Sequence, residues 1–272
     1  MSSQLPHPFE EARPSELSQI QGVCLDIDDT LSTDGKLEAD AYAALWMLKQ
    51  TGFYVVPITG RPAGWCDLIA RFWPVNAVIG ENGAFSFFVE KSDRLSVRKK
   101  LETQKGESDD RLREKLKKLG DEIRTHFPQS RTASDQAYRE CDLAIDICED
   151  VAPWSDQEVA RLLEFARNRG AHAKLSSIHV NIWFGDYDKK KGFDTWLNYA
   201  QPQGAPAPDR WLYIGDSPND EPLFATFKHS VGVANLKRYY DRLVSFPTWI
   251  TQCESGAGFV EMAESLIKAK VG

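Results

Sequence analysis

The stretch VCLDIDDTL, residues 23–31, decides how the rest of the chain is interpreted. Its apolar start ends in three carboxylates, Asp26, Asp28 and Asp29, within four positions. Because like charges this close repel each other, a buried strand does not end in them without compensation. Taken alone, the pattern is equally typical of an Asx turn or of a strand end that faces water. It does not fit an EF-hand calcium loop, which needs Gly and Glu at two positions where this chain has leucine.

The composition indicates a globular protein of one large or two ordinary domains. The chain has 272 residues, of which 42% are hydrophobic and 27% are charged, so extended disorder is not expected. The net charge of −7 argues against a nucleic-acid-binding face, and no apolar run reaches the roughly 18 residues that span a membrane. Residues 1–19 lack a secretory signal pattern and predict a flexible leader. Five cysteines without a CxxC spacing suit a reducing compartment, so we expect a cytoplasmic location.

Short apolar segments that stop at small or polar residues alternate with helix-like segments along most of the chain. The apolar segments are rich in β-branched and aromatic residues, as expected for strands covered on both faces. This alternation predicts an α/β fold with a doubly wound, Rossmann-like parallel sheet, in which ligands bind at the carboxyl ends of the strands. The expected strands are 22–28, 53–59, 76–80, 211–215 and 230–235, and the expected helices are 38–52, 63–73, 192–200, 220–227 and 258–270.

Residues 84–185 have a different pattern and predict an inserted α+β domain. A hairpin-like segment, two helix-like segments and several strand-like segments follow one another there. The core domain would then consist of residues 20–83 and 186–272, with the insertion as a cap domain. Nothing in the sequence predicts the oligomeric state.

Four short motifs lie at strand ends or at a helix start of the predicted core. In this order and at these places, they resemble the motifs of the haloacid dehalogenase-like (HAD) hydrolase superfamily. The insertion between the second and third motifs, together with ENGA at 81–84, is similar to the Cof-type subclass with its C2B cap. The motifs are DIDDTL with Asp26 and Asp28, ITGR with Thr59, KKKGFDTW with Lys191, and GDSPND with Asp216, Asn219 and Asp220.

The resemblance implies a role for each carboxylate. Asp26 would attack phosphorus and form an aspartyl-phosphate, while Asp28 would protonate the leaving oxygen and then deprotonate water. Mg2+ would be held by Asp26, by Asp216 and by the backbone carbonyl of Asp28, with Asp220 as outer support. Asp29 stands where the family more often has Gly, and we interpret it as tightening the loop.

The resemblance also implies a phosphate-binding set. Thr59 and Lys191 would hold the phosphate oxygens that gain charge in the transition state, and Gly60 would let the backbone approach closely. Among three adjacent lysines we assign Lys191, because it directly precedes the predicted helix, and we expect Lys189 and Lys190 to face solvent.

Further polar residues are candidates for substrate contact or for support of the site. Arg61 would reach either the substrate or the surface, and the sequence leaves both interpretations open. The cap candidates are polar residues in or near predicted cap strands, and Asn219 would orient the lysine or the metal shell. The cap candidates are Arg139, Lys174, His179 and Asn181.

The predicted activity is Mg2+-dependent hydrolysis of a small phosphorylated metabolite, with sugar phosphates as the expected class. A phosphomutase of the same superfamily, similar to the C2B-capped phosphomannomutases, is an alternative because it also uses a paired DxD motif. A non-catalytic binding module is a further alternative, although decay of the site should delete a motif residue and none is missing. The only partner expected is the phosphorylated small molecule, with no nucleic acid and no membrane.

Overall fold

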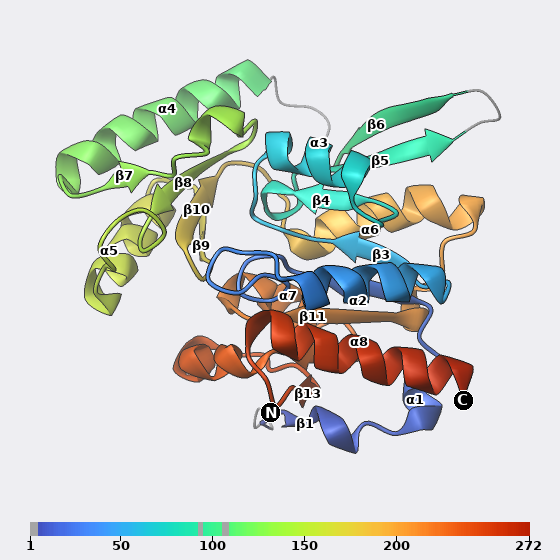
Figure 1. Ribbon diagram of the computed structural model, residues 1–272. Coiled ribbons are helices and arrows are strands. Elements are labelled where there is room, and N and C mark those ends of the chain that lie inside the picture. Colours follow the sequence, from blue (N-terminus) through green and yellow to red (C-terminus); the bar gives the residue numbers. More distant parts are fainter. Residues whose placement is uncertain (1–4, 92–94, 105–108) are drawn as a thin grey trace.

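The computed structural model describes residues 5–91, 95–104 and 109–272. Its centre is a six-stranded sheet of parallel neighbours in the order β1-β13-β12-β11-β2-β3 (Figure 1). This sheet confirms the predicted doubly wound α/β core. The strands are β1 (His7–Pro8), β2 (Gly22–Leu25), β3 (Tyr54–Pro57), β11 (Trp211–Gly215), β12 (His229–Gly232) and β13 (Trp249–Ile250).

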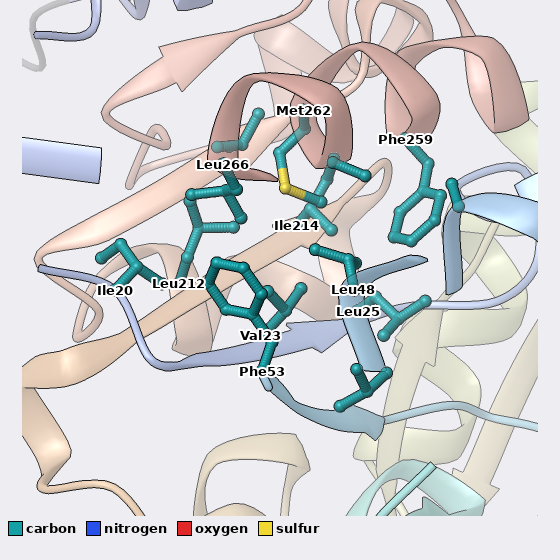
Figure 2. Close-up of a cluster of buried hydrophobic side chains, with 14 of the residues drawn as sticks. Ile20, Val23, Leu25, Leu48, Phe53, Leu212, Ile214, Phe259, Met262 and Leu266 are labelled. Atoms are coloured by element: carbon teal, nitrogen blue, oxygen red, sulfur yellow. The ribbon is translucent and has the colours of Figure 1, made fainter. Parts of the chain in front are cut away.

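Helices cover both faces of this sheet, which explains why its strands are apolar throughout. Val23 and Leu25 join a cluster with residues of α2 and α8, including Leu48 and Met262 (Figure 2). Cys24 points to the opposite face and packs with residues of α6 and α7. Burial of each such large side chain contributes about 1.5–3 kcal/mol. The helices of the core are α1 (Pro14–Leu17), α2 (Ala39–Gln50), α3 (Ala63–Phe72), α6 (Lys189–Ala200), α7 (Glu221–Phe224) and α8 (Ser255–Val271).

Residues 5–19 belong to the segment that was predicted to be a flexible leader, but in the structure they pack against the core. Strand β1 pairs with β13, and Phe9 meets Trp249 edge to face at 6.1 Å between ring centroids. Phe9 and Leu17 are both buried in the core cluster. Residues 1–4 of the predicted leader lie outside the described residues.

A three-stranded antiparallel sheet lies in the chain between the core strands β3 and β11. It consists of β4 (Val78–Gly80), β5 (Phe85–Lys91) and β6 (Ser96–Glu102). Phe85 and Phe87 pack beside α3, and Phe88 packs into the cluster under α6. The predicted cap boundary at residue 84 therefore falls inside this sheet, and the β5–β6 pair packs on the core.

The cap proper is a four-stranded antiparallel sheet in the order β7-β8-β10-β9, with α4 and α5 on one face. Ile145 and Ile182 point under these helices, while Asp142 and Asn181 point to the opposite face, toward the core. Figure 1 shows the cap beside the core, with α4 on its outer side. The elements are α4 (Asp109–His126), β7 (Arg131–Thr132), β8 (Asp142–Asp146), α5 (Asp156–Arg167), β9 (His172–Leu175) and β10 (His179–Trp183).

None of the helices within the described residues is long and apolar enough to cross a membrane.

Candidate active site

Carboxylates from three segments meet where β2 and β11 end. Asp26 directly follows β2, and Asp216 directly follows the neighbouring strand β11. Asp220 ends the 3-10 turn Pro218–Asp220, and its Oδ2 accepts the backbone N–H of Asp216 at 2.9 Å and of Ser217 at 3.1 Å. One side-chain oxygen from each of Asp26, Asp216 and Asp220 lies within 4.8 Å of the others, and all three residues are buried. The first and fourth motifs thus form one acidic cluster.

The cation in this cluster is Lys189, and the predicted Lys191 lies elsewhere. The Lys189 Nζ lies 2.9 Å from Oδ1 of Asp26 and 2.5 Å from Oδ1 of Asp220, and its side chain is 1% exposed. Lys191 is 46% exposed, and its Nζ pairs with Asp186 at 2.5 Å. The predicted position of the lysine is therefore wrong by two residues.

The reason for this error is the start of α6. The helix begins at Lys189 instead of Gly192, because Asp188 is its N-cap and accepts the backbone N–H of Lys191 at 2.8 Å. Asp is among the preferred N-cap residues, so Asp188 is a signal in the sequence that could have placed the helix start correctly. Gly83 supports this start, since a Cβ on it would lie 2.0 Å from the Asp188 carbonyl oxygen. Its φ of +105° also favours glycine.

The cluster has more carboxyl groups than basic groups. Burial raises the pKa of Asp26 to about 7, against the opposing effect of Lys189. Burial also raises the pKa of Asp216, and the neighbouring Asp220 and Asp26 add to that effect. Burial lowers the pKa of Lys189, but Asp220 and Asp26 outweigh it and hold that pKa above its ordinary value. Three buried carboxylates thus face one ammonium, an imbalance that a bound cation would relieve.

The donor set of the cluster fits a hard divalent cation. Oδ1 of Asp216 accepts the hydroxyl of Thr30 at 3.0 Å, whereas Oδ2 of Asp216 is buried without a hydrogen-bond partner among the described residues. Mg2+ prefers oxygen ligands such as these. Of the residues assigned to metal, Asp26 and Asp216 contribute side chains to the cluster. Asp220 completes it, while the side chain of Asp28 does not belong to it.

Thr59 lies beyond the end of β3, the strand next to β2 in the sheet. It is fully buried, and its backbone N–H donates to the carbonyl of Ile79 at 2.9 Å. Its hydroxyl oxygen accepts the backbone N–H of Arg61 at 3.0 Å. The second motif is therefore fixed beside the end of β2.

Gly60 and Asn219 lie in a crowded polar layer next to this loop. A Cβ on Gly60 would come within 3.3 Å of side-chain atoms of Asn181 and Asn82. Asn219 donates to Oδ1 of Asn82 at 3.3 Å and accepts the hydroxyl of Ser217 at 2.9 Å. The predicted support residue thus links the fourth motif to the ENGA segment.

Asp28 lies in the tight turn that follows β2. The carbonyl of Ile27 accepts the backbone N–H of both Leu31 and Ser32, and Asp29 has a φ of +53°. This left-handed conformation would suit Gly, and Asp tolerates it better than most residues. The Asp28 side chain is 15% exposed and forms an ion pair with Arg61 at 2.7 Å.

The cap candidates Arg139 and Asn181 bind protein groups. The Arg139 side chain is fully buried and donates to the carbonyl of Gly60 at 2.8 Å and to Asp142 at 2.9 Å. Asn181 donates to Oδ2 of Asp142 at 3.1 Å. Arg139 thus joins the cap to the loop after β3, whereas the hydrogen bond of Asn181 lies within the cap.

The other two cap candidates have different surroundings. Nε2 of His179 lies 2.9 Å from a carboxylate oxygen of Glu149, and His179 is buried. Lys174 in β9 is half-buried and lines a hollow between cap and core together with Leu163 and Pro218.

Glu81 is a residue that the sequence analysis noted only as part of ENGA. Its buried carboxylate accepts four backbone N–H groups, from Ala63 at the start of α3 and from Glu140, Cys141 and Asp142 at the start of β8. Its side chain therefore ties the cap strand to the core. Only the three-dimensional structure reveals this, because the four donors come from two segments distant in sequence.

Comparison with known proteins shows which family part of this chain resembles. Residues 23–108 match the family of haloacid dehalogenase-like hydrolases, which confirms the predicted resemblance. No curated protein matches the chain in a search of their sequences.

Solved structures with the same fold cover nearly the whole chain. The C-terminal domain of trehalose-6-phosphate phosphatase from C. albicans is 13% identical, with a TM-score of 0.69, and covers 98% of this chain and 99% of its own. Sucrose-phosphatase from Synechocystis, solved with sucrose and phosphate, is 18% identical with a TM-score of 0.59, and the coverage is 91% and 98%. A HAD-superfamily phosphatase from Bacteroides thetaiotaomicron is 18% identical with a TM-score of 0.57, and the coverage is 99% and 100%. At these identities the likeness shows a common fold.

Proposed function

We propose that this chain, a haloacid dehalogenase-like hydrolase by family match and fold, is a phosphatase that hydrolyses a small phosphate monoester with Asp26 as nucleophile. The observation that carries the proposal is the cluster of Asp26, Asp216 and Asp220 around Lys189 at the carboxyl ends of neighbouring strands. In doubly wound sheets this edge is where ligands bind.

Asp26 and Asp28 divide the chemistry. An oxygen of Asp26 forms a bond to phosphorus while the bond from phosphorus to the ester oxygen breaks. Asp28 gives its proton to that leaving oxygen, and the alcohol departs. Water then attacks the aspartyl-phosphate, Asp28 takes up a proton from the water, and phosphate leaves with Asp26 restored.

Thr59 and Lys189 bind the transferred group in this proposal. The Thr59 hydroxyl is fixed by the turn after β3, and the Lys189 ammonium is fixed by two carboxylates. Donors held in place before reaction need little reorganisation when charge builds up on the phosphate oxygens. We assign to Lys189 the role that the sequence analysis gave to Lys191.

Mg2+ is the cofactor that fits the acidic cluster. Asp26 and Asp216 would hold it, with Asp220 and the carbonyl of Asp28 as further oxygen donors. When bound, the ion neutralises charge between the carboxylates and the phosphate dianion. The observation in favour of this fit is the buried Oδ2 of Asp216, which has no hydrogen-bond partner among the described residues.

We propose a sugar phosphate as the substrate class. Two of the structural neighbours are phosphatases of trehalose-6-phosphate and of sucrose phosphate by name.

A phosphate-release screen tests the proposed function. The purified chain is incubated with sugar phosphates, nucleotides and phosphoglycolate, with Mg2+ or with excess EDTA. We expect phosphate release from at least one sugar phosphate, dependent on Mg2+ and lost in Asp26→Asn.

Other outcomes would change the assignment. An isomerised sugar phosphate without release of phosphate would indicate a phosphomutase. Full activity in Asp26→Asn would refute the mechanism, and no turnover of any ester would favour a binding module.

A further inference from the structure

The guanidinium of Arg61 lies buried between the core and the cap. Its side chain is 5% exposed and forms ion pairs with Asp28 of the core and with Glu149 and Asp135 of the cap. The guanidinium carbon also lies 4.4 Å from the ring centroid of Trp65, which limits its movement out of plane. One side chain therefore joins the expected acid/base to two carboxylates of another domain.

Arg61 determines the orientation of the Asp28 carboxylate. Its Nε lies 2.9 Å from Oδ1 and 3.0 Å from Oδ2 of Asp28, and its Nη2 lies 2.7 Å from Oδ1. Such forked contacts fix the plane of a carboxylate as well as its position. A shift of Arg61 would therefore move the group that must meet the leaving oxygen.

Glu149 is the nearer of the two cap carboxylates that bind Arg61. Its Oε1 accepts from the same Nη2 of Arg61 at 2.7 Å, whereas Asp135 accepts from Nη1 at the longer distance of 3.3 Å. Its other oxygen lies 2.9 Å from Nε2 of His179. Glu149 and Asp28 thus bind the same nitrogen of Arg61.

The loop that carries Glu149 is itself well fixed. The carboxylate of Asp146, at the end of β8, accepts the backbone N–H of Cys148 at 3.0 Å, of Glu149 at 2.8 Å and of Asp150 at 2.8 Å. His179 and Arg61 lower the pKa of Glu149 to about 2, although burial of the carboxyl group opposes this shift. The carboxylate of Glu149 is therefore ionised at neutral pH and lies at a defined place.

We propose that Glu149 is a positioning residue for Asp28: it fixes Arg61, and Arg61 orients the acid/base only while the cap is seated on the core. This inference rests on the proposed phosphatase activity. It makes general acid catalysis a joint property of both domains, whereas the attack by Asp26 depends on the core alone.

The leaving group separates these two contributions. An alkoxide leaving from a sugar phosphate needs a proton as its bond to phosphorus breaks, and Asp28 supplies it. A nitrophenolate is stable as an anion and leaves without that proton. Loss of a well-oriented acid should therefore slow alkyl esters strongly and p-nitrophenyl phosphate little.

The test compares kcat/KM of Glu149→Gln on both ester classes. The alkyl ester is the sugar phosphate that the wild-type chain hydrolyses best, and the aryl ester is p-nitrophenyl phosphate. We expect a loss of about tenfold or more for the alkyl ester and of less than about twofold for the aryl ester. Asp150→Asn, an exposed carboxylate in the same loop, is the matched control and should change neither value.

A double-mutant cycle makes the test specific to Asp28. Asp28→Asn should show the same leaving-group pattern more strongly, and Glu149→Gln should add no further loss in that background, because both changes remove the same contribution. Additive losses in the double variant would overturn the inference.

Three further results would overturn it as well: equal losses for both ester classes, a larger loss for the aryl ester, or no loss at all. If Glu149→Gln does not fold, Glu149→Asp replaces it in the test. This variant keeps the negative charge, but its side chain is one methylene shorter, so we expect the same leaving-group pattern. Failure of the proposed function itself would be distinct, because the wild-type chain would then release phosphate from neither class.

Discussion

Lys189 illustrates how far a single side chain can be assigned without a structure. Three adjacent lysines precede the helix, and composition alone cannot tell which of them points inward. The choice depends on where α6 begins, because successive helical residues are rotated by about 100° around the axis. The N-cap at Asp188 makes Lys189 the first helical residue and directs it between two carboxylates.

Substitution of the two lysines by methionine should have opposite outcomes. Lys189→Met should reduce kcat/KM by about 100-fold or more, since a fixed cation at the transferred group is lost. It should also lower the free energy of unfolding by about 3–5 kcal/mol, because two buried carboxylates lose their partner. Kinetics with the best substrate and chemical denaturation measure both effects.

Lys191→Met is the matched control for that experiment. Its ammonium is exposed and pairs only with the exposed Asp186, so activity and melting temperature should stay near the wild-type values. A large loss of activity in Lys191→Met, with Lys189→Met active, would restore the assignment made from the sequence.

At the level of elements, the turn Glu81–Gly83 between β4 and β5 holds the cap against the core through hydrogen bonds. Its three residues all have positive φ, of 44°, 55° and 105°. The chain can therefore turn sharply there, with Glu81 directed at the start of β8 and Gly83 against the start of α6. One short turn thus positions both a cap strand and the helix that carries Lys189.

Glu81→Gln should loosen this connection. The amide NH2 of Gln would face backbone N–H groups and leave about two of them without an acceptor, at a cost of about 1–3 kcal/mol for each group. We expect a lower melting temperature and faster hydrogen exchange at residues 140–142. Hydrogen exchange followed by mass spectrometry reads out these amides directly.

Glu140→Gln is a suitable comparison for the same experiment. Its partly exposed carboxylate pairs with Lys100, and such surface pairs contribute little to stability. If both variants exchanged alike at residues 140–142, the role assigned to Glu81 would be incorrect.

For the whole molecule, the sequence predicted the parallel core because its strands are apolar runs that stop at polar residues. Asp26, Thr59 and Asp216 were predictable for the same reason, since each directly follows or lies just beyond such a run. Contacts between domains were not predictable. Arg139, Glu149 and Asp142 lie on cap segments whose approach to the core depends on the packing of two complete domains.

The packing of the β5–β6 hairpin on the core could not be predicted from the sequence either. Its place in the chain suggested the insertion, but its aromatic side chains bury against α3 and α6. Alternation along a strand predicts that one face is buried, without predicting which partner covers it.

Mg2+ should stabilise the molecule as a whole. Binding of a cation to the folded acidic cluster raises stability by mass action and relieves repulsion among three buried carboxylates. The melting temperature of EDTA-treated protein should rise with added Mg2+, and this shift should be strongly reduced in Asp216→Asn. An equal shift in both proteins would place the ion elsewhere.

The proposed mechanism requires that Asp26 is phosphorylated during turnover. The measurement is rapid acid quench of the chain during hydrolysis of its best substrate, followed by peptide mass spectrometry. We expect a phosphorylated peptide in which the modified residue is Asp26. In Asp26→Asn, both this peptide and the activity should be absent. A phosphorylated residue other than Asp26, or full turnover by Asp26→Asn, would contradict it.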